Sequence, residues 1–406
     1  MKRIALNFIC KNESHVIERM LRSALSVVDV IVAVDTGSTD NTIDIIKRFG
    51  VSNNIPTIVF ERLFDNFSNS RNYALNKTYL VCQELFGAIN DIWGLTFDCD
   101  EILRVLEDFD KNRLSFDLYL VVVKLNEGLS VVRQALYRLS IAFRWEGPIH
   151  EILVWEKETT IRVSFMLELS IFSESKGGSW KTNLEDKFLN YARLLGDYAN
   201  AGHEDFRTLF YVGASYASAG YYSKFEGKTK QHCEKAEVYF ERAAGITEIS
   251  SQEKVLLYND FAKNKIILKR DWATIQPLFF LAYSNDNGKA EAIAYIIRHY
   301  MARKQWNTAY LFSYTAYMLY HGTTPSIKSM AGLNLDLYAW ELLLYYYICC
   351  YYTRKFDEGK AARKQLMEFV LNHMNNFSYR QLLIIQVNSP FYLFLRASLH
   401  QLFNRH

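Results

Sequence analysis

The chain has 406 residues, which is enough for two or three domains around a large buried core. Half of the residues are apolar, and this excludes an intrinsically disordered protein. The formal net charge is only +3, and Lys and Arg are scattered rather than grouped, so the composition does not indicate a nucleic-acid-binding protein. The five prolines are few for this length, which favours long helices with short connections.

The six cysteines show neither metal-ligand spacing nor a disulfide framework. A reducing compartment is therefore expected, and with it a cytoplasmic location; association with a membrane surface is left open. The first apolar run is short and is interrupted by Asn7, which is typical of a strand rather than a signal peptide. The longest hydrophobic stretch, residues 342–352, is well short of the roughly 20 residues that span a bilayer, so no transmembrane segment is predicted.

Strands and helices alternate in the N-terminal part of the chain. Apolar runs predict buried strands, and apolar residues three and four positions apart predict helices. Short connectors between them indicate an α/β domain with a doubly wound, Rossmann-like sheet. Gly50 is expected to end the second helix. The expected strands cover residues 4–10, 30–34, 57–60 and 91–97, and the expected helices cover residues 14–25, 43–49 and 70–86.

An acidic cluster, TFDCDE at residues 96–101, follows the last of these strands. Right-handed crossovers place the loops after each parallel strand along one edge of the sheet, where open α/β folds bind ligands. Asp98 and Asp100 project to the same side of an extended segment, because side chains alternate along it. Two carboxylates on one side suit Mg²⁺ or Mn²⁺, and such an ion can bridge to phosphate oxygens. The turn that begins at Asp35 should face the same crevice.

From about residue 180 the pattern changes to helices. A linking helix is expected at residues 179–204, and residues 205–406 are predicted to form an all-α helical-repeat domain. Small residues at the expected helix crossings and the spacing of the apolar residues resemble tetratricopeptide (TPR) repeats. In the first pair, the polar stretch 223–231 is expected to lengthen the turn. The three predicted helix pairs cover residues 209–243, 297–316 and 347–366.

Four motifs occur in order along the N-terminal part, at residues 7–13, 34–42, 65–72 and 97–101. Together they resemble family 2 glycosyltransferases of the GT-A fold, and more narrowly the subgroup with C-terminal tetratricopeptide-like repeats. Residues 143–151, FRWEGPIHE, are similar to that subgroup's Trp-x-Gly-x-x-His-Glu element. The resemblance implies a GT-A glycosyltransferase domain over residues 1–178. It also implies that the substrate is a nucleoside diphosphate sugar, with a UDP-sugar favoured.

The donor would need hydrogen-bond acceptors for its base and ribose, and a cation for its diphosphate. Asp35 stands at a strand end and can accept from a base N–H or a ribose hydroxyl, although it can instead form a helix-capping turn. Arg71 can reach the base or the diphosphate, because a guanidinium matches phosphate oxygens; its alternative is a salt bridge to Asp65. The resemblance implies that five residues bind the nucleotide sugar: Asp35, Arg71, Asp98, Asn12 and Glu13.

The resemblance also implies a metal site that holds Mn²⁺ or Mg²⁺. It makes Asp100 the direct ligand and Asp98 a ribose or water-mediated contact, while His150 would complete the metal shell or orient the acceptor. The ion would offset the charge that develops on the departing diphosphate. Members of the subgroup often have another histidine where this chain has residues 169–174, and Glu174 is a further candidate there.

A transferase of this kind needs a base that takes the proton of the acceptor hydroxyl. Glu151 and Glu146 are the candidates, and Glu151 is preferred. The predicted activity is therefore metal-dependent, inverting sugar transfer, in which the acceptor hydroxyl attacks the anomeric carbon in one displacement. A glycan, a lipid-linked sugar or a protein would be the acceptor. The helical repeats would recognise this acceptor or would join copies of the chain into a homo-oligomer.

Two other functions fit parts of the sequence. One is a helical-repeat scaffold or binding protein whose GT-A domain has lost catalysis, but the presence of Asp35, Arg71, Asp98 and Asp100 together argues against it. The other is a sugar-phosphate nucleotidyltransferase, which also uses a doubly wound sheet and Mg²⁺. Such an enzyme would have a glycine-rich phosphate loop after its first strand, and residues 11–14, KNES, contain no glycine.

Overall fold

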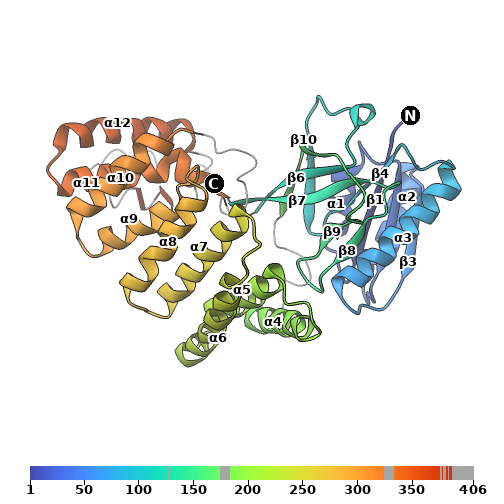
Figure 1. Cartoon of the computed structure of the whole chain (residues 1–406). Coiled ribbons are helices and arrows are strands. Elements are labelled where there is room, and N and C mark those ends of the chain that lie inside the picture. Colours follow the sequence, from blue (N-terminus) through green and yellow to red (C-terminus); the bar gives the residue numbers. More distant parts are fainter. Residues whose placement is uncertain are drawn as a thin grey trace. The chain divides into compact units, whose positions relative to one another are not determined.

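The computed structural model describes residues 1–125, 129–173, 183–323, 333–374, 377, 381–382 and 384–385. The chain divides into two compact units (Figure 1). The first comprises residues 1–278 together with Leu333, and the second begins at Phe279, so the main boundary falls inside helix α8 (Trp272–Asn285).

The first unit contains a mixed sheet with the strand order β3-β2-β1-β4-β7-β6-β10-β5 (Figure 1). The first four strands in this order are parallel, and β7 runs antiparallel to β4. The parallel part confirms the predicted doubly wound arrangement, and the fold is GT-A-like. The strands are β1 (Arg3–Cys10), β2 (Val30–Asp35), β3 (Thr57–Glu61), β4 (Ile92–Leu95), β5 (Glu101–Val105), β6 (Leu118–Lys124), β7 (Leu129–Arg138) and β10 (Val163–Ser173).

Different elements cover the two faces of this sheet. Because side chains alternate along a strand, β1 sends Ile4, Leu6 and Phe8 to one face and Ala5 to the other. The first face packs against α1 and α2, and the second packs against α3 and the hairpin of β8 and β9. Burial on both faces explains why β1 and β2 are continuous apolar runs. The bounds are α1 (Ile17–Ala24), α2 (Thr42–Asn53), α3 (Phe67–Phe86), β8 (Arg144–Glu146) and β9 (Ile152–Val154), with a 3-10 turn, η1 (Lys111–Arg113), before β6.

Two side-chain amides attach the β8–β9 hairpin to the rest of the unit. Asn72 of α3 accepts a hydrogen bond from the Trp145 N–H (2.7 Å) and donates one to the Trp145 carbonyl (2.9 Å). Gln134 of β7 accepts from the Leu153 N–H (2.8 Å) and donates to the Leu153 carbonyl (3.1 Å). Each strand of the hairpin is therefore held by one amide, which fixes the position of the connecting residues 147–151.

The second helix differs from the sequence-based expectation at its end. α2 continues through Gly50 to Asn53, and Asn54 follows in a left-handed conformation with φ 54°. Gly50 is buried against Thr57 of β3, where a Cβ atom would lie 2.3 Å from the Thr57 hydroxyl oxygen. The prediction that Gly50 ends the helix is therefore wrong. The glycine instead allows the helix and the strand to approach closely.

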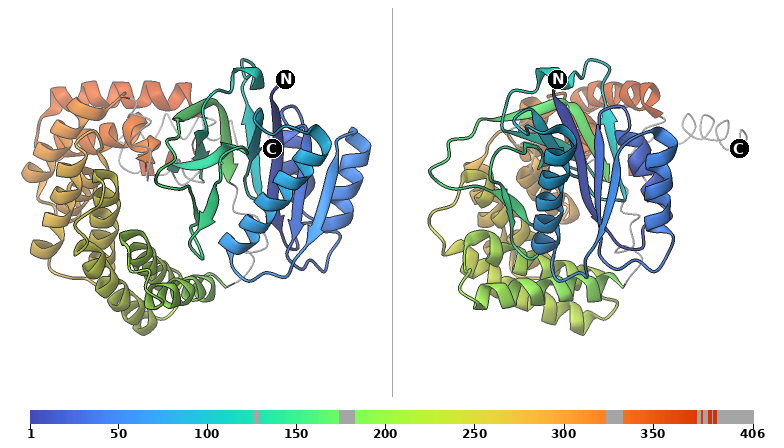
Figure 2. Two further views of the ribbon diagram at one scale, coloured as in Figure 1. Left: turned by 45° about the vertical axis from the view of Figure 1, so that its right-hand side comes forward. Right: turned by 90° about the vertical axis from the view of Figure 1, so that its right-hand side faces the viewer.

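Helices follow the sheet, and neighbouring helices pack as antiparallel pairs (Figure 2). Small residues lie at the crossings, as predicted: a Cβ on Gly220 would lie 2.6 Å from Cys233, and one on Gly359 would lie 3.2 Å from Cys350. The assignment to tetratricopeptide repeats stays a prediction. In the first unit the helices are α4 (Leu184–Asn200), α5 (Phe206–Tyr222), α6 (Glu226–Ala244) and α7 (Ser251–Ile267). The elements after α8 are α9 (Glu291–Ala302), α10 (Trp306–Tyr320), β11 (Leu333–Asn334), the π-helical turn η5 (Leu337–Glu341), α11 (Leu342–Tyr352) and α12 (Phe356–Asn372).

Two features of the helical part refine the expectations. α6 begins at Glu226, so most of the stretch 223–231 is helical and the predicted long turn is wrong. The expected linking helix corresponds to α4, which belongs to the same compact unit as the sheet. The predicted boundaries at residues 178 and 204 stay a prediction. None of the described helices is long and apolar enough to cross a bilayer.

The attachment of the hairpin generates a first prediction. Replacing Asn72 with alanine leaves the N–H and the carbonyl of Trp145, a residue with 6% exposure, without partners. We expect the free energy of unfolding to fall by about 1–3 kcal/mol, measured by urea denaturation. Asn69→Ala, on an exposed position of the same helix, is the matched control and should change it by less than about 0.5 kcal/mol. Equal effects of the two substitutions would contradict the proposed attachment.

Candidate active site

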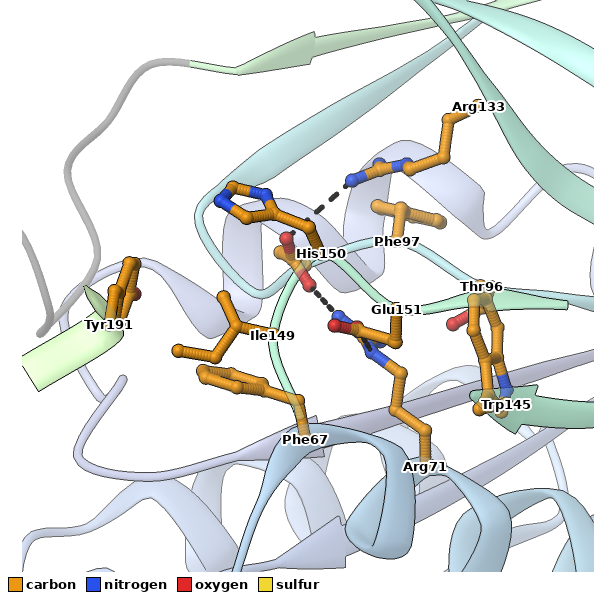
Figure 3. A pocket seen from close by; sticks show the side chains of 11 residues that line it. Phe67, Arg71, Thr96, Phe97, Arg133, Trp145, Ile149, His150, Glu151 and Tyr191 are labelled. Carbon is orange, nitrogen blue, oxygen red and sulfur yellow. Dashed lines mark hydrogen bonds and ion pairs between the residues drawn. The ribbon is translucent and has the colours of Figure 1, made fainter. Parts of the chain in front are cut away.

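Two adjoining pockets lie at the edge of the sheet where β1, β2 and β4 end. The smaller, about 250 Å³, is lined by Arg71, Arg133, Glu151 and Trp145 among others, and we call it the arginine pocket (Figure 3). The larger, about 800 Å³, is lined by Asp98, Asp100, Asn12 and Glu13 among others, and we call it the aspartate pocket. Both pockets share the side chains of Phe67, Asp98, His150 and Tyr191.

Five charged side chains of alternating sign form a network, and four of them line the arginine pocket. Arg71 pairs with Asp98 (2.6 Å) and with Glu151, and Arg133 pairs with Asp98 (3.6 Å) and with Glu101. Figure 3 shows the two arginines reaching into the pocket from α3 and β7, with dashed lines that run from both of them to the carboxylate between them. Three carboxylates and two guanidiniums leave one net negative charge. Asp100 adds another at the neighbouring pocket.

Asp98 is the member of this network that faces both pockets. Its side chain is 46% exposed, whereas those of Arg71 and Glu151 are only 10% and 11% exposed. Partial withdrawal from water raises the pKa of Asp98, but the charges of Arg71 and Arg133 outweigh this effect and hold the pKa below its usual range. The carboxylate is therefore ionised at neutral pH. It presents an anionic oxygen acceptor to anything that enters either pocket.

His150 lies in the connection between β8 and β9 and has a left-handed backbone, with φ 54°. Its ring stacks on Tyr211 of α5, with 4.2 Å between ring centroids, and Arg207 of α5 donates a hydrogen bond to its carbonyl (2.6 Å). His150 as a whole keeps an exposed surface, but the protein packed around its ring lowers the pKa of His150 to about 4, and the positive charges of Arg207 and Lys187 add to this effect. The imidazole is therefore neutral at physiological pH.

Asp35 is at the predicted sheet edge, but its side chain folds back onto the turn that follows it in the chain. One carboxylate oxygen accepts from the N–H groups of Gly37 (2.9 Å) and Ser38 (2.8 Å), and the other accepts from the Ser38 hydroxyl (2.5 Å). The residue is only 2% exposed. This geometry matches the alternative of a capping turn. Contact between Asp35 and a nucleotide stays a prediction.

The other predicted donor-binding residues are distributed over the two pockets. Asn12 and Glu13 line the aspartate pocket, where the Asn12 side chain accepts a hydrogen bond from the Thr39 N–H (2.7 Å). Arg71 lines the arginine pocket and does not pair with Asp65, which instead binds Arg62 (3.0 Å). The salt bridge to Asp65 is therefore made by Arg62 and not by Arg71.

The two candidate bases occupy different environments. Glu151 lines the arginine pocket beside Arg71. The side chain of Glu146 is 44% exposed and pairs with Arg144 (3.0 Å), and it lines neither pocket. The structure thus brings Glu151, Arg71, Asp98 and His150 together and leaves Glu146 apart. Glu174 lies outside the described residues.

The residues of the aspartate pocket fit a divalent cation in their chemistry. Carboxylate oxygens are the ligands that Mg²⁺ and Mn²⁺ prefer, and Asp98, Asp100 and Glu13 supply them. Among the described residues, no group of three or more His, Cys, Asp or Glu side chains is already arranged to hold a metal ion. Mg²⁺ is usually bound by one or two carboxylates together with substrate phosphates, so a complete protein cage is not required.

Several residues at the pockets were not expected from the sequence. Arg133 follows two valines within strand β7. A charged residue at such a position indicates an acidic partner nearby, because a buried arginine needs one. This pattern could have identified Arg133. Lys187 and Tyr191 come from α4, which looks from its sequence like an ordinary amphipathic helix. No local pattern marks them. Only the packing of α4 brings them to the site.

One family model matches part of the N-terminal region of the chain. Residues 8–79 match the model of Glycosyl transferase family 2, and this segment includes Asn12, Glu13, Asp35 and Arg71 but ends before Asp98. No curated protein matches the chain.

Solved structures of low similarity also match. One is S. aureus TarS 1-349 in complex with UDP-GlcNAc, at 14% identity and a TM-score of 0.33, covering 66% of this chain and 91% of that one. Another is S. aureus TarS, at 13% identity and a TM-score of 0.30, covering 70% and 53%. TarS 1-349 in complex with UDP matches at 12% identity and a TM-score of 0.29, covering 70% and 88%. TM-scores this low carry no argument about the fold or the activity of this chain.

The buried pair of Arg71 and Glu151 generates a second prediction. Arg71→Met leaves the Glu151 carboxylate buried without its partner, and we expect a loss of about 3–5 kcal/mol in the free energy of unfolding. The double variant Arg71→Met/Glu151→Gln should lose less than the sum of the single variants in urea denaturation. Arg62→Met removes the more exposed pair with Asp65 and should cost less than about 1 kcal/mol. Additive single effects would show that the two side chains are not coupled.

The environment of His150 generates a third prediction. In NMR spectra assigned with the variant His150→Gln, the ring signals of His150 should not titrate between about pH 5.5 and 8, because the neutral form is favoured. The unfolded chain binds this proton more tightly than the folded chain does. His150 therefore lowers stability as the pH falls below about 6.5, and this loss levels off below the folded pKa. A titration midpoint near the ordinary value would refute this environment.

Proposed function

We propose that this protein is a glycosyltransferase that transfers a sugar from a nucleoside diphosphate sugar to an acceptor hydroxyl. The observation that carries the proposal is the position of Asp98 and Asp100. They follow β4 at the carboxyl edge of the sheet and line one pocket with Asn12 and Glu13, which follow β1. The family 2 match over residues 8–79 covers the β1 side of this pocket. A UDP-sugar is the donor that the sequence motifs favour.

The chemistry is a single displacement with inversion. The acceptor hydroxyl enters the arginine pocket and its oxygen attacks the anomeric carbon, while the bond between this carbon and the diphosphate oxygen breaks. Glu151 takes the proton of the hydroxyl, since it lines this pocket and Glu146 does not. Arg71 pairs with the Glu151 carboxylate and so orients it before the reaction.

We infer that Asp100 and Asp98 hold Mn²⁺ or Mg²⁺ and that neutral His150 assists them or orients the acceptor. When bound, the ion supplies Lewis-acid stabilisation of the charge on the leaving diphosphate. Asp98 stays ionised because of its two arginines, and this keeps one oxygen donor available over a wide pH range. The acceptor would be a glycan, a lipid-linked sugar or a protein. The helical repeats would recognise it or mediate homo-oligomer formation.

A fourth prediction tests the metal site. Asp100→Asn should reduce Mn²⁺-dependent transfer, or hydrolysis of a UDP-sugar, by at least about a hundredfold, because Lewis-acid stabilisation is worth several kcal/mol. The unfolding temperature of this variant should stay near that of the wild type. Asp108→Asn, in an exposed turn after β5, is the matched control and should keep full activity.

The same assay separates the proposal from its main rival. If the wild-type chain neither hydrolyses nor binds any nucleotide sugar with Mn²⁺, a catalytically inactive scaffold is the better interpretation. If Asp100→Asn keeps full activity, the assignment of the metal ligand is wrong although sugar transfer itself stands.

A further inference from the structure

Helix α4 forms part of the wall of the aspartate pocket. Lys187 and Phe188 are each a helix-surface neighbour of Tyr191, because they precede it by four and three residues. All three line the pocket with Asp98 and Asp100. α4 lies outside the segment that matches the glycosyltransferase family and beyond the predicted GT-A domain. The pocket is thus completed by a helix that belongs to the helical part of the chain.

Lys187 brings a positive charge to an acidic pocket. Its ammonium lies 5.9 Å from the ring centre of Phe188 and 5.7 Å from that of Tyr191, so two aromatic rings flank it. The residue is partly buried. Burial lowers the pKa of Lys187, and the carboxylates of Asp100 and Asp98 oppose this change. These two carboxylates are therefore the charges that attract the ammonium in the structure.

A diphosphate that enters this pocket changes the balance of charge. The pocket already has the carboxylates of Asp98, Asp100 and Glu13 on its wall, and a diphosphate adds more negative charge beside them. Arg71 already pairs with Asp98 and Glu151, and Arg133 already pairs with Asp98 and Glu101. Lys187 has a long and flexible stem, and an ammonium binds phosphate oxygens as a point charge.

We propose that Lys187 of α4 binds the phosphate oxygens of the sugar donor, so that the helical part of the chain completes the donor site. This inference deepens the proposed function and rests on it. Lys187 has the role of a substrate-binding residue in this proposal. It takes up no proton and forms no bond with the sugar.

The test is calorimetric binding of UDP and of uridine to the full chain in the presence of Mn²⁺. Lys187→Met should weaken UDP binding by about tenfold or more, since it removes one charge-assisted contact, and should leave uridine binding unchanged. Lys187→Arg should restore most of the loss, because it keeps the positive charge. Arg193→Met is the matched control, as it removes an exposed cation from the same helix and should bind UDP like the wild type.

Each other outcome overturns the proposal in a distinct way. If Lys187→Met binds UDP as tightly as the wild type, Lys187 does not contact the diphosphate. If this variant loses UDP and uridine binding equally, the lysine supports the structure of the pocket instead. If the wild type binds neither ligand, the proposed function fails and this inference fails with it. Uridine binding by Lys187→Met also shows that the variant is folded.

Discussion

The site depends on the sharing of one carboxylate, that of Asp98, between two arginines. Arg71 comes from α3 and Arg133 from β7, and both ion pairs end on the residue that follows β4. Three elements far apart in the sequence are therefore fixed at one point. A charge this close to the protein interior is tolerable only when it is paired, so a change in any one partner affects the others. The same arrangement keeps Asp98 anionic and turned toward both pockets.

The rest of the site is attached to this point by polar contacts of the backbone. Asn72 is the neighbour of Arg71 on α3, and it binds both backbone groups of Trp145. The helix that supplies the central arginine thus also holds the hairpin that supplies Glu151. Arg207 and Tyr211 of α5 support His150 from the helical side. Sheet, hairpin and helices contribute to one site, and none of them contains it alone.

The sequence predicted best the parts in which local pattern and tertiary structure agree. β1 and β2 are buried on both faces, so their apolar runs were sufficient, and the position of Asp98 and Asp100 at the sheet edge followed from the strand order. The strands from β5 to β10 were not predicted. β10 pairs parallel with β6 and antiparallel with β5, and such a mixed arrangement depends on tertiary pairing that a local pattern does not specify. Gly50 was misread because a glycine that permits close packing looks like one that ends a helix. Lys187 could not be predicted, since only tertiary packing brings α4 to the pocket.

The position of α4 has a consequence for how the chain can be divided. A fragment cut where the sheet finishes, near residue 178, would keep every motif of the glycosyltransferase resemblance and would still lack one wall of its larger pocket. It would also leave the His150 connection without the aromatic partner on α5. The smallest autonomous portion of this protein therefore has to extend past the sheet into the helices, and motif boundaries drawn from sequence alone would set its end too early.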